Sequence, residues 1–402
     1  MATPKEAKQE AIQNLLTRGV SEVIGAEHLK KRLAAGDTLR IKLGIDPTSP
    51  HVHLGRTVAL LKLQDFQRMG HTPVFIVGDF TGVIGDTSDK ESERPMLTQE
   101  VIEENKKQYL AQVEKIIDLE KAEFHYNSEW LTKLTYKEIG EHANQFSVAD
   151  FIARENIHKR LTAGKRVSLR EVLYPLMQGY DSVAVHADVE VGGTDQRFNM
   201  LAGRTLLTHY NKQPQSIIMG PLMPGLDGRK MSSSWGNTIN VDDAADDMYG
   251  KVMSLHDDLV GTYFELCTRV PMSDVRNTMA QVAGGTLHPK DAKMKLAREV
   301  VTLYHGAAAA DEAETHFQQV FREGRLPEEI QEFRTTQNTP LIDVLVTAGV
   351  ISSRSEFRRL LDGGAIHSMS ADGTTRIMDA NTKIITPAVF KVGKRRFIRV
   401  VL

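Results

Sequence analysis

The feature that most constrains the fold is a strand–helix–strand pattern near the start of the chain. Residues 39–45 form a short apolar run, and a turn rich in proline ends it at residues 46–50. A helix is expected from about Leu54 to Met69, closed by Gly70, and residues 73–77 have the pattern of the next strand. Because strands joined through a helix pair in parallel, the sequence predicts an α/β fold with a parallel sheet. Ligands of such sheets bind at the carboxyl ends of the strands.

The chain as a whole divides into segments of different composition and predicted secondary structure. Its 402 residues are more than one hydrophobic core usually serves. The first segment is expected to begin with one amphipathic helix over residues 4–35, and it holds further candidate strands at 189–193 and 216–219. The expected organisation is a sheet-containing domain at 1–241, an α-helical domain at 242–323, a linker at 324–338 and a small α/β unit at 339–402.

Charge is distributed unevenly along the chain. The net charge is −2. Residues 354–402 contain ten Lys and Arg against four Asp and Glu, which gives +6 and leaves −8 for the remainder. A basic tail on an acidic body suggests contact with a polyanion, although a well-solvated terminal domain would show the same balance.

The cysteine count and the distribution of apolar residues indicate neither an oxidising compartment nor a membrane. The single cysteine, Cys267, has no partner for an internal disulfide and offers no cluster for a metal. The start of the chain lacks the apolar core of a signal peptide, and no apolar run has the length of a bilayer span. These observations favour a cytoplasmic protein.

Two candidate phosphate-binding segments follow the first two predicted strands. Residues 51–56 place His53 and Gly55 where a helix begins, and the free N–H groups of a helix start suit phosphate. Residues 78–94 form a glycine-containing loop with Lys90 and Arg94, two cations that could clamp pyrophosphate. For either cation considered alone, an exposed polar loop is the favoured interpretation.

A third segment, Lys230-Met231-Ser232-Ser233-Ser234, follows a stretch that contains Gly225 and Gly228. A mobile loop with a lysine and hydroxyls could close over a triphosphate as charge develops in a transition state. The triplet Lys-Met-Ser means little by itself, but it gains weight when a histidine–glycine turn precedes it in the same chain.

Together these segments resemble the HIGH and KMSKS signatures of class I aminoacyl-tRNA synthetases, in order and separation. Residues 174–181 and 192–199 are similar to the amino-acid pocket of tyrosyl-tRNA synthetases in particular. The resemblance covers essentially the whole chain. It implies a Rossmann-like catalytic domain, an α-helical domain for the anticodon region of tRNA and a C-terminal RNA-binding module, as in bacterial members. It also implies two reactions: formation of tyrosyl-adenylate from L-tyrosine and ATP, then transfer of tyrosine to tRNA(Tyr).

The resemblance also implies roles for residues that would handle ATP. Thr48 and His53 match contacts to the γ-phosphate, and Asp195 matches the group that binds the ribose. The other residues implied in ATP binding or catalysis are Gly55, Arg56, Lys90, Arg94, Gly193, Lys230, Met231, Ser232 and Ser233. ATP is implied as a substrate with Mg²⁺, and no residue is identified as a metal ligand.

A second group of residues is implied in binding L-tyrosine. Asp181 would accept a hydrogen bond from the substrate hydroxyl, and phenylalanine would leave that acceptor unpaired; the tyrosyl enzyme is itself the standard example of this discrimination. Tyr174, Gln178 and Asp86 would hold the ammonium group, Gln196 would orient the carboxylate, and Asp46 belongs to the same pocket. Tyr174, Gln178 and Asp181 are spaced to share one helix face.

The tail is implied in RNA binding. A helix is expected from Ser352 to Leu361, and it would present Arg354, Arg358 and Arg359 to a phosphate backbone. The family is usually a homodimer, so a second copy of the chain is an implied partner.

Three positions depart from the family pattern. Arg56 stands where HIGH ends in histidine, Ser233 stands where KMSKS has its second lysine, and Lys42 stands where many members have a tyrosine that touches the substrate hydroxyl. Three alternatives stay open at this point: specificity for tryptophan, a nucleotidyltransferase acting on a small metabolite, or an RNA-binding protein that has lost catalysis.

Overall fold

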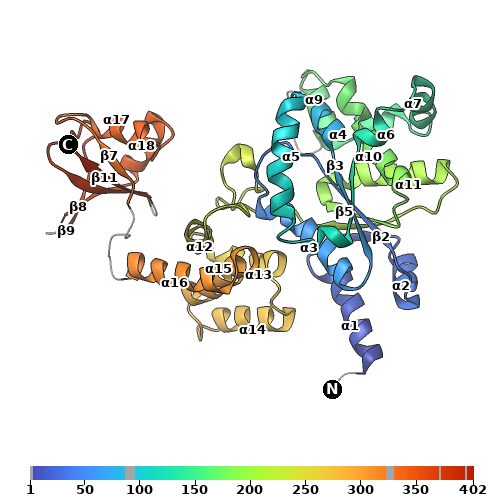
Figure 1. The fold of residues 1–402 in the computed structure, drawn as a ribbon, viewed down its shortest axis with the longest axis horizontal. Helices are drawn as coiled ribbons and strands as arrows, with labels where there is room; N and C mark the ends of the chain where they lie inside the picture. Colours follow the sequence, from blue (N-terminus) through green and yellow to red (C-terminus); the bar gives the residue numbers. More distant parts are fainter. Residues whose placement is uncertain (1–2, 87–95, 323–329, 371–372, 394–395) are drawn as a thin grey trace. The chain divides into compact units, whose positions relative to one another are not determined.

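The computed structural model describes residues 3–86, 96–322, 330–370, 373–393 and 396–402 (Figure 1). The chain divides into two compact units, Met1–Ala310 and Asp311–Leu402, and each is described by itself. No helix in these described ranges is both long and apolar enough to cross a membrane.

The first unit is built on a six-stranded sheet. Its strands are β1 (Glu22–Ile24), β2 (Arg40–Ile45), β3 (Thr72–Val77), β4 (Glu123–Tyr126), β5 (Val189–Gly193) and β6 (Ser216–Gly220). They lie in the order β1-β6-β5-β2-β3-β4, and every pair is parallel except β1 with β6. The predicted strand–helix–strand unit is confirmed as β2, α3 (Leu54–Arg68) and β3.

Helices pack against this sheet and against one another. Helix α3 packs along β2, β3 and β5, while α11 packs on β5 and on α10. Besides α3, the described α-helices before residue 242 are α1 (Pro4–Thr17), α2 (Ala26–Ala35), α4 (Asp79–Ile84), α5 (Gln99–Val113), α6 (Ser128–Leu131), α7 (Tyr136–Ala143), α8 (Val148–Ile152), α9 (Glu155–Thr162), α10 (Leu169–Ala184) and α11 (Arg197–His209). Short 3₁₀ turns are η1 (Leu119–Lys121), η2 (Thr194–Gln196) and η3 (Ser233–Trp235).

The single helix expected over residues 4–35 is wrong. The chain forms α1, then β1, then α2, with Gly19 and Gly25 at φ +58° and +76° on either side of the strand. Residues with positive φ break a helix, and glycine adopts them without steric cost. Between them, β1 pairs with β6 from far along the sequence, a contact that local periodicity cannot reveal.

The helical character expected for 242–322 is confirmed. Its helices are α12 (Ala245–Met253), η4 (Asp257–Leu259), α13 (Val260–Cys267), α14 (Met272–Ala283), α15 (Pro289–His305) and α16 (Ala307–Arg322). Those up to Ala310 share the first compact unit with the sheet. Arg18, at the end of α1, donates to the carbonyl oxygens of Phe264 and Thr268 at 3.2 and 2.7 Å, which joins α1 to the last turn of α13. The boundary at 241/242 stays a prediction.

The second unit contains a smaller sheet in the order β7-β11-β10-β8-β9. After the end of α16, its described elements are β7 (Glu332–Arg334), α17 (Leu341–Thr347), α18 (Arg354–Asp362), β8 (Ile366–Ser370), β9 (Gly373–Arg376), β10 (Ala388–Val392) and β11 (Arg396–Val401). A buried apolar core, which includes Leu345, Phe357 and Ile398, joins both helices to the sheet.

One part of the expected linker at 324–338 is instead a strand. Residues Glu332–Arg334 form β7, which pairs in parallel with β11, so that Phe333 lies opposite Val400. The segment is short and polar, and its strand conformation depends on a partner at the end of the chain. The small α/β unit therefore begins before the expected boundary at 339.

Candidate active site

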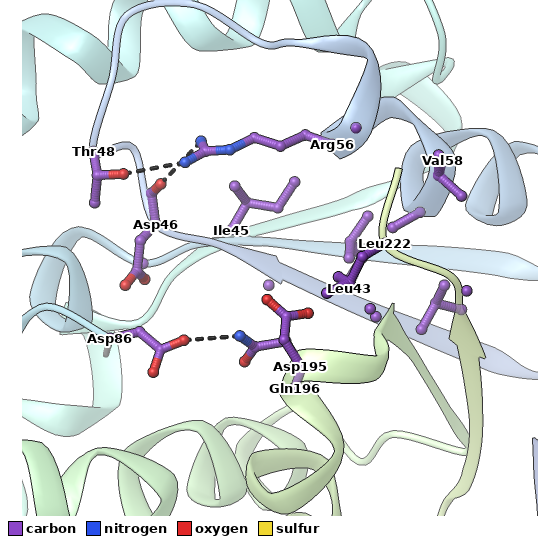
Figure 2. Close-up of a pocket in the computed structure, with 18 of the residues that line it drawn as sticks. Leu43, Ile45, Asp46, Thr48, Arg56, Val58, Asp86, Asp195, Gln196 and Leu222 are labelled. Atoms are coloured by element: carbon purple, nitrogen blue, oxygen red, sulfur yellow. Dashed lines mark hydrogen bonds between the residues drawn. The ribbon is translucent and has the colours of Figure 1, made fainter. Parts of the chain in front are cut away.

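The carboxyl ends of the parallel strands surround a cavity of about 420 Å³ in the first unit (Figure 2). Every predicted ATP- or tyrosine-site residue within the described ranges lines it. They are Asp46, Thr48, His53, Gly55, Arg56, Asp86, Tyr174, Gln178, Asp181, Gly193, Asp195, Gln196, Lys230, Met231, Ser232 and Ser233. Lys90 and Arg94 lie outside the described residues. The structure thus brings together residues that follow β2, β3, β5 and β6, the start of α3 and one face of α10.

The histidine turn and the lysine–serine loop meet at this cavity. His53 is the N-cap residue of α3, with extended backbone angles of φ −86° and ψ 159°. The backbone N–H of Gly55 donates to the sulfur of Met231 at 3.2 Å. A Cβ atom at Gly55 would lie 3.0 Å from the His53 ring, so glycine keeps the start of the helix open. A helix N-terminus therefore faces the cavity beside the loop, as phosphate binding requires.

Arg56 braces the segment after β2. Its guanidinium donates to Thr48 Oγ1 at 3.1 Å, to the hydroxyl of Tyr109 at 2.9 Å and to the backbone oxygen of Asp46 at 3.4 Å (Figure 2 shows the contacts with Thr48 and Asp46). Tyr109, on α5, is fully buried, and burial raises the pKa of its hydroxyl. Tyr109 was not predicted from the sequence, because it lies on a separate helix. Arginine thus holds in place the loop that carries Thr48.

Asp195 and Lys230 form an ion pair across the cavity. Lys230 Nζ lies 3.1 Å from Asp195 Oδ2, and both side chains are partly exposed. A Cβ atom at Gly193 would come within 2.5 Å of Asp195 Oδ1, so the absence of a side chain at Gly193 gives this carboxylate its place. The carboxylate implied in ribose binding and the lysine of the loop are therefore neighbours.

The serine loop is held by a residue that sequence reasoning missed. Buried Asn237 accepts from the backbone N–H of Ser232 at 2.9 Å and donates to the backbone oxygen of Lys230 at 3.1 Å. Ser233 is exposed at the start of η3, and Ser232 and Ser234 share a hydroxyl hydrogen bond of 3.0 Å. The loop therefore presents hydroxyls and one lysine to the cavity.

Helix α10 supplies one wall of the cavity, and it presents Tyr174, Gln178 and Asp181 together as predicted. The hydroxyl of Tyr174 donates to Asp46 Oδ2 at 2.8 Å, and Thr81 donates to Asp46 Oδ1 at 2.7 Å. Both oxygens of Asp46 are thus engaged. Its carboxylate links the end of β2 to α10 and α4.

Asp86 and Gln196 approach each other from two different segments. Gln196 Nε2 donates to Asp86 Oδ2 at 2.8 Å (Figure 2). Gln196 in turn accepts from Asn199 Nδ2 at 2.9 Å. These contacts fix the amide of Gln196 in one orientation, with its carbonyl toward α11.

Asp181 is a buried carboxylate with two neutral donors. Trp130 Nε1 lies 2.8 Å from Asp181 Oδ1, and Asn127 Nδ2 lies 3.4 Å from Oδ2. Burial raises the pKa of Asp181 to about 7, against the lowering effects of the Lys42 charge and the two donors. Sequence reasoning missed Asn127 and Trp130. Only the position of Asn127 directly after β4 could have indicated it.

Lys42 does not line the cavity. It is fully buried beneath it and pairs with Glu190, which does line it. Sequence reasoning did not single out Glu190.

The predicted RNA-binding arginines lie on α18 in the second unit. Arg354 is exposed and pairs with Asp343 at 2.6 Å, while Arg358 and Arg359 are exposed on the same helix. Ser353 caps this helix by accepting from the backbone N–H of Glu356.

Known proteins match this chain over most of its length. The family described as tRNA synthetases class I (W and Y) matches residues 5–322. The tyrosine–tRNA ligase of Carboxydothermus hydrogenoformans is 44% identical over 403 residues, covering 96% of this chain and 97% of that one. The tyrosine–tRNA ligase of Moorella thermoacetica is 45% identical over 393 residues, covering 96% and 94%.

Solved structures share the fold. A tyrosyl-tRNA synthetase of Archaeoglobus fulgidus complexed with L-tyrosine matches with a TM-score of 0.61 at 22% identity, covering 76% of this chain and 99% of that one. A C-terminally truncated mitochondrial tyrosyl-tRNA synthetase of Coccidioides posadasii matches with a TM-score of 0.61 at 24% identity, covering 77% and 96%. With the Rossmann-like sheet and the cavity at its strand ends, these matches define a class I aminoacyl-tRNA synthetase fold. The chain belongs to the tryptophan and tyrosine family of class I tRNA synthetases.

Proposed function

We infer that this chain activates L-tyrosine with ATP, forming tyrosyl-adenylate and pyrophosphate, and then transfers tyrosine to the 3′ terminal adenosine of tRNA(Tyr). The observation that carries this inference is the buried carboxylate of Asp181 at the cavity wall, held by Trp130 and Asn127. A phenol hydroxyl can donate to such an acceptor, whereas a phenylalanine ring would leave it unpaired. Relatives at 44–45% identity over nearly the full chain are tyrosine–tRNA ligases.

The first reaction needs little proton transfer, because the attacking group is already a carboxylate. Its oxygen attacks the α-phosphorus of ATP, the bond to the bridging oxygen breaks, and pyrophosphate leaves with the electron pair. Catalysis then rests on positioning and on stabilising phosphate charge. We assign phosphate contacts to His53, Thr48 and Lys230. Their support is the shared cavity and the position of His53 at a helix N-terminus.

Binding of the amino acid is assigned to the side of the cavity formed by α10. Tyr174, Gln178 and Asp86 would surround the substrate ammonium, and Gln196 would orient its carboxylate toward ATP. Asp46 supports this arrangement by accepting from Tyr174. Asp195 and the backbone of Gly193 would bind the ribose, and Lys230 would leave Asp195 when the nucleotide arrives. Lys90 and Arg94 are proposed as additional phosphate contacts from their sequence positions alone.

Mg²⁺ is proposed to accompany ATP. This ion usually keeps several waters and binds through substrate phosphates rather than an all-protein cage. Within the described ranges no group of three His, Cys, Asp or Glu side chains is arranged to hold a metal. The ion would withdraw charge from the leaving pyrophosphate, and no protein ligand is assigned to it.

tRNA is proposed to contact the helical region and the second unit, where Arg354, Arg358 and Arg359 are exposed on α18. A homodimer is also proposed. Large apolar side chains are exposed on the segment from α7 to α10: Tyr136 is 94% exposed, Val148 73% and Leu169 71%. Such a surface suits a second protein surface better than water. We place the reaction in the cytoplasm, where its tRNA substrate is used.

The direct test of the complete reaction is charging of tRNA(Tyr) with radiolabelled amino acids, one at a time. Only tyrosine should become attached to tRNA in a linkage that mild alkali releases. Attachment of another amino acid at a comparable rate, with no charging by tyrosine, would refute the proposed function. Sedimentation of the same preparation should give about twice the mass of one chain if the homodimer proposal is right.

A further inference from the structure

Lys42 is a lysine with no contact with solvent, and its ammonium group is completely surrounded by acceptors. Its Nζ donates to the backbone oxygen of Gln178 at 2.8 Å and to Ser182 Oγ at 2.8 Å, and lies 2.9 Å from Glu190 Oε1. The exposed fractions of the two paired side chains are 0% for Lys42 and 2% for Glu190. A lysine ammonium has three donors, so these three partners saturate it.

Lys42 and its partners lie on three elements. Lys42 on β2 lies directly opposite Glu190 on the neighbouring parallel strand β5. Gln178 and Ser182 belong to α10, and they lie on either side of Asp181 in the sequence. One ammonium group therefore fixes the turn of α10 that carries the proposed hydroxyl acceptor.

Glu190 extends the same network. Its Oε1 accepts from Gln178 Nε2 at 3.1 Å, its Oε2 accepts from Ser182 Oγ at 3.3 Å, and Gln215 also donates to it. Glu190 lines the cavity, while Lys42 lies below it. The network thus joins Glu190, which lines the cavity, to Gln178 and Ser182 of α10.

Stability alone does not explain why the chain has this buried ion pair. Replacing such a pair with apolar side chains of similar volume is often neutral or stabilising. The pair here stands beside a third buried charge, Asp181, so that two carboxylates share one site with one lysine. The charged groups facing Asp181 are Lys42 from β2 and Glu190 from β5, and Trp130 and Asn127 face it as neutral donors. Asp46 and Asp86, which also act on Tyr174, are the other acids nearby.

We propose that Lys42 is a positioning residue for recognition of the substrate hydroxyl, which fixes the turn of α10 carrying Asp181 and balances the negative charge of Glu190 beneath the pocket. The inference rests on the proposed binding of tyrosine beside Asp181. It accounts for a lysine at the position where many family members have a tyrosine. Lys42 acts through its neighbours, since its three donors are already engaged by the protein.

The opposite charges of Lys42 and Glu190 predict opposite effects on Asp181. Removing the lysine charge leaves Glu190 as an uncompensated negative neighbour, which favours the protonated form of Asp181. Removing the charge of Glu190 leaves the lysine unopposed and favours the ionised form. A residue that only filled space would produce no such pair of opposite changes.

The test uses the full chain and three variants: Lys42→Met, Glu190→Gln and the two combined. Tyrosine-dependent ATP–pyrophosphate exchange is measured between pH 5.5 and 9. Lys42→Met should raise the tyrosine KM roughly tenfold at pH 7 and leave the ATP KM unchanged. The inflection in the pH profile of kcat/KM for tyrosine should move to higher pH in Lys42→Met and to lower pH in Glu190→Gln. Selectivity for tyrosine over phenylalanine should fall in Lys42→Met.

Lys62→Met is the matched control for loss of a buried lysine. Lys62 is also buried and donates to the backbone oxygens of Leu15 and Arg18, away from the pocket residues. This variant should have a lower melting temperature. The pH of its inflection and its selectivity for tyrosine should be those of the original chain.

The combined variant guards against misfolding, because it leaves no unpaired charge from the lysine–glutamate pair. If Lys42→Met does not fold, Glu190→Gln carries the test through its inflection, and the inflection of the combined variant should lie between those of the two single variants because the opposite effects offset each other. A folded Lys42→Met with the inflection and selectivity of the original chain, or a folded Glu190→Gln with its inflection, would overturn the proposal. Absence of tyrosine-dependent exchange in the original chain would instead refute the proposed function.

Discussion

At the scale of single residues, the protonation state of Asp181 links structure to substrate affinity. Its carboxylate is buried and has one close donor, Trp130, and a longer contact with Asn127. An ionised carboxylate can only accept hydrogen bonds, so it complements a phenol that donates. Once protonated, it offers a donor of its own and loses that complementarity.

The pKa of Asp181, raised by burial from 3.8 to about 7, predicts a pH dependence near neutrality. The ionised form predominates above this value and the protonated form below it. The kcat/KM for tyrosine in exchange should therefore be level above pH 8 and fall as the pH drops below 7, approaching roughly tenfold per unit. Asp181→Asn should lower kcat/KM and abolish this inflection. A flat profile between pH 6 and 8 in the original chain would contradict the assignment.

The contacts of Arg56 lead us to expect an effect on ATP binding. Its planar fork reaches Thr48 and Tyr109 together, and the single ammonium of a lysine cannot reproduce that geometry. Arg56→Lys should raise the ATP KM by about tenfold, with the tyrosine KM unchanged. The measurement is exchange with one substrate varied at a time. An unchanged ATP KM would show that the bracing contacts do not matter for nucleotide binding.

At the scale of elements, the strands and helices that form the site were largely predictable, because their signals are local. The run before Asp46 and the apolar residues after Gly70 gave β2 and β3, and the spacing of Tyr174, Gln178 and Asp181 gave one face of α10. Elements defined by distant partners were missed. Strands β1 and β7 are each three residues long and exist through pairing with β6 and β11.

The same distinction applies to the candidate site. Residue types and strand-end positions indicated the side chains that line the cavity. Contacts between separate elements were not predictable, such as Arg56 with Tyr109, Asp181 with Trp130, and Asn237 with the serine loop. Each of these depends on how two elements pack, which no spacing within one element records.

The position of α10 depends on a buried ion pair at its start. Glu171 is bonded to Arg160 of α9, and it also accepts from the backbone N–H of Ser168 at 3.0 Å as part of a capping box. Both charged side chains are almost fully buried. Glu171→Ala should lower the free energy of unfolding by about 3–5 kcal/mol, because Arg160 would lose its buried counter-charge. Urea denaturation measures this change.

An exposed pair on a neighbouring helix provides the control. Lys159 and Glu155 on α9 form an ion pair with both side chains largely exposed. Glu155→Ala should leave the urea midpoint unchanged, since solvent screens such pairs. Equal loss of stability in the two variants would show that burial of the Glu171 pair is not what holds the start of α10.

At the scale of the whole molecule, the two compact units predict separable activities. The proposed ATP and tyrosine site lies entirely in the first unit, whereas the exposed arginines of α18 lie in the second. A chain lacking residues 330–402 should keep tyrosine-dependent exchange and lose about a hundredfold in kcat/KM for tRNA charging, because it lacks phosphate-backbone contacts. Full charging activity after this deletion would refute RNA binding by the second unit.

A charge-reversal variant tests RNA binding by the second unit without deleting that unit. Arg358→Glu combined with Arg359→Glu should weaken tRNA binding with a reduced dependence on salt concentration, and exchange should be unaffected. Circular dichroism should match the original chain, since both side chains are exposed.

The central claim is that the first unit forms an adenylate from tyrosine in particular. Its most direct measurement is ATP–pyrophosphate exchange by the purified chain, with tyrosine, phenylalanine and tryptophan supplied separately and without tRNA. We predict exchange with tyrosine, and none above background with phenylalanine or tryptophan at the same concentration. Exchange driven by tryptophan and not by tyrosine, or by no amino acid at all, would contradict the account of Asp181 and the cavity around it.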